Sequence, residues 1–327
     1  MSDIDPDEND VARVLRAAGG RAQPSDEMRQ AVRAAVHAEW RATVRKGSER
    51  RYVWMALAAS VMVAALGLWV ARPYFVTREV VASVTRTLGS VESRSGSLGR
   101  WRTAPDVHAG DDVRTGADGR VALQLRDGVS LRLDHDTRVA FLDAGHIEVK
   151  SGAVYLDAGA ISSAKDHLRV GTPAGVVQHV GTQYEARIVK DGVRIRVREG
   201  RVDLVPQHGN VQSAGMGEQL LISSSGSVQR DTIAPSDPQW EWAASTAPVF
   251  DINGRPVRDF LTWVGRELGR EIVFVDAESE AEANRAVLSG SVAGLTPAEA
   301  LPAVLATTQL RSTTGEVKIE VTRQPNR

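Results

Sequence analysis

The chain has 327 residues, of which 42% are hydrophobic and 25% are charged, and its net charge at pH 7 is −1. This length predicts two or three folded domains, and the balanced charge gives no basic surface for direct binding of nucleic acid. The absence of cysteine excludes disulfides, thiolate nucleophiles and Cys-ligated metal sites.

Residues 1–52 predict a short tail with two amphipathic helices, preceded by an acidic, solvated lead-in. The first helix ends at the glycines 19 and 20, and its apolar positions are Val11, Val14 and Leu15. The second helix begins after Ser25, and every fourth residue along it is apolar: Met28, Val32, Val36 and Trp40. Two short helices bury little surface by themselves. Their apolar faces either pair with each other and the membrane surface, or dock a cytoplasmic partner.

Residues 53–71 predict a transmembrane helix. They are uncharged, and a helix of this length spans about 28 Å, which matches the hydrocarbon core of a bilayer. Trp54 and Trp69 lie near its two ends, where amphipathic aromatic residues favour the interface. A buried core helix is expected to carry a polar stripe, and a cleaved signal peptide begins nearer the N-terminus. A signal anchor therefore fits this segment best.

Basic residues are denser before the predicted span than after it. Five occur at residues 41–51, whereas three occur at residues 72–86. This bias favours a cytoplasmic N-terminus. We therefore expect a single-pass protein of the bacterial inner membrane, with residues 1–52 in the cytoplasm and the C-terminal domains in the periplasm.

From about residue 80 to residue 230, short alternating runs separated by glycine and aspartate turns replace the helical period. Asp118-Gly119 and Asp127-Gly128 separate three of these runs, and Asp-Gly is a strong hairpin signal. About a dozen short strands of this kind predict an all-β sandwich or coiled sheet.

The same region carries an ordered series of turn residues. The series consists of Thr115, Gly116, Gly128, Asp134, Gly152, Gly181, Thr182 and Gly200. In this order and spacing it resembles the periplasmic domain of the FecR family of sigma-factor regulators. The residues themselves are typical of structural turns, because glycine permits positive φ or close backbone approach, and Thr and Asp hydrogen-bond locally.

The resemblance implies a role for the whole chain, because that family also joins a helical tail, one anchor helix and this outer domain. It implies an anti-sigma factor or sigma regulator whose tail binds an extracytoplasmic-function sigma factor. The outer domains would then sense a partner such as a TonB-dependent outer-membrane receptor. Release of the sigma factor would follow a conformational change, or proteolysis in or near the anchor helix.

Residues 231–247 are predicted to be a linker with an aromatic clasp, and residues 248–327 a small α+β domain. The expected strands are residues 248–252, 271–275 and 286–292, the expected helices are residues 256–268 and 297–305, and a hairpin around residues 314–315 ends the chain. This doubled βαβ pattern resembles the short N-terminal domain of secretins and TonB-dependent receptors, which implies a protein-binding module.

The sequence contains no pattern typical of a hydrolase, a metalloprotease or a nucleotide-binding loop. Asp134-His135-Asp136 could suggest a metal, but a turn at a strand end explains it. We expect no catalytic site, no cofactor and no metal. The alternative to a sigma regulator is a non-catalytic envelope scaffold or polymer-binding membrane protein, in which the tail serves only for retention.

Overall fold

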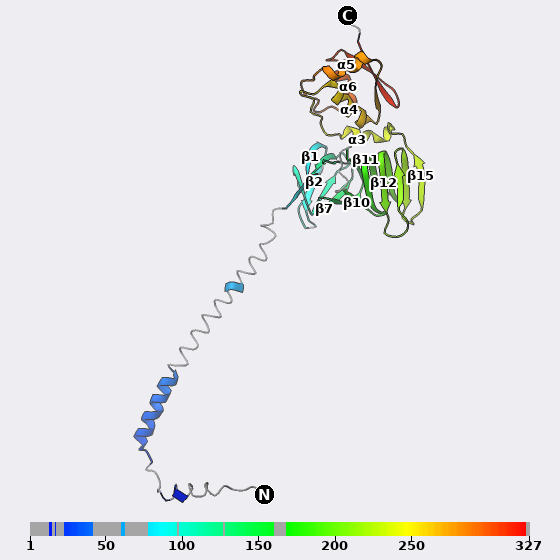
Figure 1. The fold of residues 1–327 in the computed structure, drawn as a ribbon. Coiled ribbons are helices and arrows are strands. Elements are labelled where there is room, and N and C mark those ends of the chain that lie inside the picture. Colours follow the sequence, from blue (N-terminus) through cyan, green and yellow to red (C-terminus); the bar gives the residue numbers. More distant parts are fainter. Residues whose placement is uncertain are drawn as a thin grey trace. The chain divides into compact units, whose positions relative to one another are not determined.

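The computed structural model describes residues 13–14, 17, 23–41, 60–62, 78–96, 98–126, 128–159 and 168–324 (Figure 1). The chain divides into two compact units, residues 1–77 and residues 78–327. Each unit is described by itself below.

In the first unit, residues 26–41 form a helix, as the four-residue period predicts. Ser25 caps this helix, since its Oγ accepts a hydrogen bond from the Met28 N–H at 3.3 Å. In the first turn, Asp26 pairs with Arg29 at 2.7 Å. Of the predicted first helix, residues 13, 14 and 17 are helical, whereas Val11 and Leu15 lie outside the described residues.

The predicted membrane span lies mostly outside the described residues, apart from residues 60–62, which are helical. Among the helices that the structure describes, none has the length and apolar character that a membrane crossing requires. The predicted span at residues 53–71 therefore stays a prediction.

The second unit begins with a branched sheet of fifteen strands, which confirms the predicted β-rich fold. Its first eight strands are β1 (Val80–Leu88), β2 (Val91–Ser95), β3 (Asp106–His108), β4 (Asp111–Thr115), β5 (Arg120–Leu125), β6 (Ser130–Leu133), β7 (Arg138–Asp143) and β8 (His146–Ser151). The others are β9 (Ala153–Asp157), β10 (Arg169–Thr172), β11 (Gly175–Val189), β12 (Gly192–Val205), β13 (Gln212–Gly215), β14 (Glu218–Ser223) and β15 (Val228–Thr232).

A long hairpin of β11 and β12 forms the centre of this sheet. The alternating runs at residues 175–180 and 182–192 predict two short strands in place of β11, and those at residues 193–200 and 201–206 predict two in place of β12. This prediction is wrong, because glycines bend the strands without ending them. Gly181 and Gly200 both have positive φ, and the pairing register shifts between Val180 and Gln183. Such a bulge bends a strand and increases its twist. Each strand therefore continues through a sharp bend.

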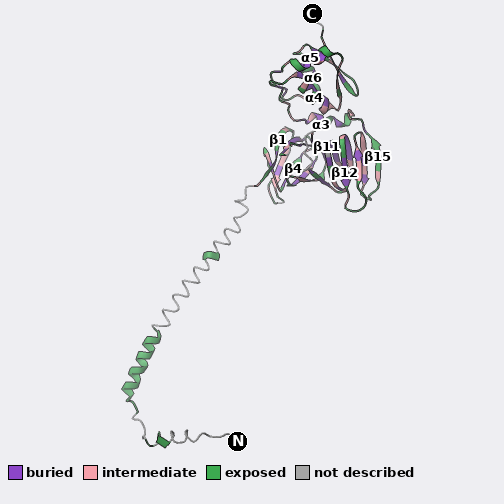
Figure 2. Cartoon of the chain, viewed as in Figure 1, coloured by how far each residue is buried: buried purple, intermediate pink, exposed green. Residues whose placement is uncertain are grey.

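Burial on strand β6 explains how the sheet meets the rest of the unit. Leu131 and Leu133 point into the main apolar core. Ser130 and Arg132 alternate with them and would face solvent in an isolated sandwich, yet both are buried. The C-terminal part of the unit covers this second face, and Figure 2 shows the buried strands below helix α3.

The C-terminal part begins with a 3₁₀ turn, η1 (Pro238–Trp240), and helix α3 (Glu241–Ser245), both inside the segment predicted as a linker. The elements that follow are α4 (Val257–Leu268), β16 (Glu271–Phe274), α5 (Ala277–Arg285), α6 (Pro297–Leu305), β17 (Leu310–Thr314) and β18 (Lys318–Arg323). The predicted helices 256–268 and 297–305 and the final hairpin are confirmed.

The predicted doubled βαβ arrangement is wrong. One sheet forms in the order β16-β18-β17, and the described residues of 248–252 form no strand. The expected strand at residues 286–292 is reduced to a single bridge between Val287 and Pro256. Helix α5 was not expected. It begins because Asp276 accepts a hydrogen bond from the Ser279 N–H at 2.7 Å, which caps an Ala- and Glu-rich run.

Candidate functional site

Helix 26–41 presents an apolar stripe to solvent. Its members are Met28, Val32, Val36 and Trp40, with exposed fractions of 59%, 59%, 61% and 62%. The Trp40 ring meets the edge of the His37 ring, with centroids 6.5 Å apart. Val14, from the predicted first helix, is also exposed, and Figure 2 shows helix 26–41 exposed along its whole length. A helix usually buries such a stripe against another surface.

The outer unit contains a second candidate site, where the C-terminal part docks on the sheet. We call it the interdomain clasp and define it by Arg132, Tyr155, Asp157, Arg266 and Glu267. Strands β6 and β9 supply the first three residues, and the last turn of helix α4 supplies the other two.

Arg132 and Glu267 form the buried centre of the clasp. Arg132 Nη1 donates to Glu267 Oε2 at 2.6 Å and Nη2 donates to Oε1 at 2.7 Å. Arg132 Nη1 also donates to the Ala243 carbonyl at 2.8 Å. The two side chains are only 1% and 5% exposed. Burial alone would lower the pKa of Arg132, but the Glu267 carboxylate raises it, so Arg132 stays charged.

Tyr155 lies against this ion pair and is fully buried. The Arg132 guanidinium lies 5.1 Å from its ring centroid, and Trp240 and Trp242 meet the ring edge-on at 6.0 and 6.3 Å. Burial raises the pKa of Tyr155 to about 12. Trp240 Nε1 donates to the Ala234 carbonyl at 3.0 Å. The two tryptophans of the predicted aromatic clasp thus pack on Tyr155 of strand β9, and the Tyr155 ring lies against the ion pair.

Arg266 and Asp157 form the outer edge of the clasp. Arg266 Nη2 donates to Asp157 Oδ1 at 2.5 Å, and Nη1 donates to Glu199 Oε2 at 2.5 Å. Burial opposes ionisation of Asp157, but its hydrogen bonds from Arg266 lower the pKa of that carboxyl below its usual value. Gln183 also donates to Asp157, at 2.9 Å. Two consecutive residues of α4 therefore bind three different strands of the sheet, β6, β9 and β12.

Close backbone approach completes the contact at the end of α4. Gly269 has a φ of 62°, and a Cβ at this position would lie 2.0 Å from the Pro235 carbonyl oxygen. Arg198 fills the adjoining space, where its Nε donates to Pro235 O at 2.6 Å and its Nη1 to Glu267 O at 2.9 Å. Only glycine permits this approach.

Sequence reasoning missed the charged members of the clasp. Arg132 stands at the outward position of an alternating run, where an arginine is ordinarily solvated. Its partner Glu267 is 135 residues further along the chain. The tryptophans at 240 and 242 were the one local signal of this contact.

Four of the predicted turn residues, Thr115, Gly116, Asp134 and Gly152, lie at or next to strand ends, and two of the four form one hydrogen-bonded unit. Thr115 Oγ1 donates to the Asp134 carbonyl at 2.6 Å and accepts the Thr137 N–H at 2.9 Å. Gly152 has a φ of 77°, and a Cβ there would lie 2.2 Å from Thr137 Oγ1. These residues set the path of the chain into β9.

Asp134 is a structural anion. Its carboxylate accepts hydrogen bonds from Arg120 Nε at 2.8 Å and Arg187 Nη2 at 2.6 Å. Although burial opposes ionisation, these bonds lower the pKa of Asp134 below its usual value. The described residues contain no group of three or more metal-ligating side chains of the His, Cys, Asp and Glu types.

The remaining predicted turn residues lie in turns between strands or in the bends of β11 and β12. Gly128, Gly181 and Gly200 have positive φ, whereas Gly116 approaches Ser90 so closely that a Cβ would lie 3.2 Å from the Ser90 Cβ. Thr182 is fully buried beside Gly181 in the bulge of β11.

Residues 111–203 match the family model of the FecR protein. The chain contains a FecR domain. The match runs from β4 to near the end of β12, so it includes every predicted turn residue, and the predicted resemblance is confirmed. The match supports a regulatory role connected with sigma factors.

Two crystal structures of a proposed anti-sigma factor from Parabacteroides distasonis are similar to this chain. Each shares 15% sequence identity, covers 65% of this chain and 99% of its own, and superposes with a TM-score of 0.36. No curated protein matches the chain.

Proposed function

We propose that this protein is a membrane-anchored regulator of an extracytoplasmic-function sigma factor. Residues 1–52 bind the sigma factor in the cytoplasm, residues 53–71 cross the inner membrane, and residues 72–327 lie in the periplasm. The observation that carries the proposal is the solvent-exposed stripe of Met28, Val32, Val36 and Trp40 on helix 26–41. The FecR domain at residues 111–203 supports the sigma factor as the partner.

The stripe has the features of a helix that binds in a groove of its partner. Its four side chains recur every fourth residue, so they form one line along the helix. Each is about 60% exposed, so each has apolar area left to bury. Trp40 stands at the end of the line, and a tryptophan that enters a partner pocket contributes about 2 kcal/mol or more to binding.

The outer unit supplies the sensing part of the proposal. The interdomain clasp joins the FecR domain to the C-terminal part through one buried and one partly buried ion pair, so a partner that binds the C-terminal part acts on a connected body. A TonB-dependent outer-membrane receptor is the partner we propose, on the basis of the resemblance. Release of the sigma factor follows a conformational change, or proteolysis in or near the anchor helix.

A bacterial two-hybrid assay of residues 1–52 against each sigma factor of the host tests the proposal, starting with the one encoded nearest. We expect one sigma factor to bind, and we expect Trp40→Ala and Val36→Asp to abolish the signal. Ala34→Asp is the matched control, because residue 34 lies roughly 160° around the helix from Val36 and is exposed. It should bind as wild type does.

A deletion separates this proposal from the alternative. Removal of residues 1–50 should deregulate a set of genes if the tail controls a sigma factor. If no sigma factor binds residues 1–52 and the deletion leaves transcription unchanged, the protein is an envelope scaffold that carries a FecR domain.

A further inference from the structure

The bent β11–β12 hairpin encloses a pocket of about 650 Å³ in the outer unit. Its lining includes Ala174, just before β11, and Ile188, near the end of that strand. In a straight strand these two positions would lie about 45 Å apart, at 3.3 Å per residue. They line one pocket because the bulge at Gly181 and Gly200 folds the hairpin back on itself.

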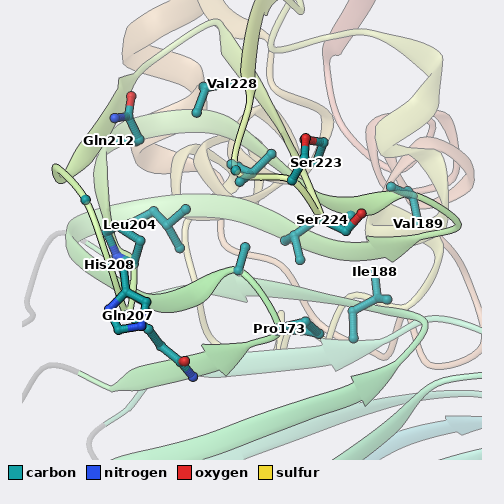
Figure 3. Close-up of a pocket in the computed structure, with 18 of the residues that line it drawn as sticks. Pro173, Ile188, Val189, Leu204, Gln207, His208, Gln212, Ser223, Ser224 and Val228 are labelled. Carbon is teal, nitrogen blue, oxygen red and sulfur yellow. The ribbon is translucent and has the colours of Figure 1, made fainter.

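The pocket has an apolar floor and a rim of turns. Figure 3 shows Ile188, Leu204, Val228 and Pro173 around the hollow. The rim comprises residues 173–174, 189–190, 192, 206–210 and 223–226, which lie in or next to the turns β10–β11, β11–β12, β12–β13 and β14–β15. The volume lies within the range of about 300–1,000 Å³ that is typical of small-molecule sites.

Strands β13 and β15 each contribute one residue to the lining of the pocket. Strand β13 pairs with β12 and strand β15 pairs with β14. Arg230 Nη1 donates to the Ser213 carbonyl at 2.8 Å and ties the two strands together. Gln212 and Val228, the first residues of the two strands, line the pocket.

The charge of the lining indicates the class of ligand. Among the described residues that line the pocket there is no Asp or Glu, and Lys190 is the one lysine or arginine. Lys190 stands exposed in the β11–β12 turn. The other polar groups on the rim are serine hydroxyls, the imidazole of His208 and the amides of Gln207, Asn210 and Gln212. An apolar floor with one cation at its edge suits a molecule with an apolar chain and one negative charge.

We propose that this pocket binds a single-chain amphiphile, with its hydrocarbon chain on the floor of the pocket and its anionic head group at Lys190. This inference goes beyond the proposed function and does not depend on sigma-factor binding. It gives the bulge glycines of the FecR domain a second role, because they bring the two ends of the hairpin together around the ligand.

Fluorescence titration of residues 78–327 with dansyl-labelled undecanoate tests the proposal. This fragment is the second compact unit, and its apolar cores lie wholly within it. We expect saturable binding at one site, and displacement by octanoate, decanoate and dodecanoate below their micelle concentrations. Each added methylene should tighten binding about two- to fourfold, as burial of a chain on an apolar floor requires. Affinity that does not change with chain length would overturn the proposal.

Variants locate the site. Val228→Trp fills the pocket and should weaken dodecanoate more than about tenfold. Ala174→Phe fills it from the opposite rim and replaces the first variant as the test if Val228→Trp loses its circular dichroism signal.

Lys190→Glu should weaken binding of dodecanoate about fivefold and leave binding of uncharged decanol unchanged. Lys150→Glu, on strand β8, is the charge control and should bind as wild type does. Wild-type affinity in both filled variants, or equal loss of decanol and dodecanoate in Lys190→Glu, would refute the assignment.

Discussion

Two regions of this protein use tryptophan in opposite ways. On helix 26–41, Trp40 is 62% exposed and stands in a stripe of equally exposed apolar residues. In the interdomain clasp, Trp240 is 1% exposed, its indole nitrogen is hydrogen-bonded, and a buried ion pair lies behind the ring that it packs on. The first surface has its apolar area still to bury, whereas in the second the charged groups of Arg132 and Glu267 already bind each other.

This difference separates a surface that binds another molecule from a surface that holds the chain together. Substitutions in the clasp should change the free energy of unfolding, because they leave buried groups without partners. Substitutions on the stripe should change binding of the partner and leave the free energy of unfolding nearly unchanged, because those side chains are already exposed in the folded protein. The predictions below test that separation, from the largest expected effect to the smallest.

Arg132→Ala should give the largest loss of stability, about 3–5 kcal/mol in the free energy of unfolding of residues 78–327, because Glu267 is then buried without a counter-ion. Urea unfolding followed by tryptophan fluorescence measures it. The double variant Arg132→Met with Glu267→Met is the matched control and should regain most of the loss, since an apolar pair leaves no charge unpaired. A loss below about 1 kcal/mol in Arg132→Ala would mean that the clasp is solvated.

Gly152→Ala should cost about 3 kcal/mol, because the residue combines a positive φ with a Cβ position 2.2 Å from Thr137 Oγ1. This turn leads into β9, which carries Tyr155 and Asp157 of the clasp. Gly128→Ala is the control, since Gly128 also has a positive φ but no atom within 4 Å of the added Cβ. It should cost only about 1 kcal/mol. Equal losses in thermal unfolding would show that close packing at residue 152 does not matter.

Asp157 should make the clasp sensitive to acid. Arg266 lowers the pKa of this carboxyl in the folded state. Its stabilising contribution is therefore complete above the unfolded pKa of about 3.9 and is lost as the pH falls toward the lowered folded value. The free energy of unfolding of wild type should exceed that of Asp157→Asn by about 2 kcal/mol at pH 7, and this difference should shrink below about pH 4.

Arg266→Gln tests the cause of that pH dependence. Removal of the guanidinium should abolish most of the difference between Asp and Asn at position 157. If the pH-dependent difference between Asp and Asn at position 157 persists unchanged in the Arg266→Gln background, measured by urea unfolding at pH 3 to 7, Arg266 is not the group that lowers this pKa.

Val32→Asp should have the smallest effect on structure. Residue 32 is 59% exposed, so the helicity of residues 1–52 should change little, with a free-energy effect within about 0.5 kcal/mol. Capture of the sigma factor should nevertheless be lost, as for Val36→Asp. Circular dichroism and a pull-down on the same sample measure both quantities. A variant that binds normally would remove residue 32 from the docking surface.

Local patterns predicted much of the secondary structure. Helices α4 and α6 and the final hairpin lie where the apolar period and the turn residues place them. The capped start of helix 26–41 follows from Ser25 in the same way. These features depend on contacts within four residues along the chain, so the sequence carries them directly.

Other elements were decided by contacts between distant parts of the chain. The glycines at 181 and 200 read as strand ends, but pairing of β11 with β12 and β9 holds the strands continuous and turns the glycines into a bend. The expected strand at residues 286–292 does not form, because the C-terminal sheet consists of β16, β18 and β17 and does not pair with this segment. Strand pairing is a choice among distant partners, which alternation by itself does not specify.

The sequence by itself determined the elements that arise from local spacing: the apolar stripe of the tail, the turns of the FecR domain and the helices of the C-terminal part. Only the tertiary structure decided that the outward face of β6 is covered. Burial of Arg132 depends on Glu267, 135 residues away, and on the tryptophans between them. An outward arginine has the same local sequence whether solvent or a helix covers it, so the physical reason for the clasp lies in the packing of distant segments.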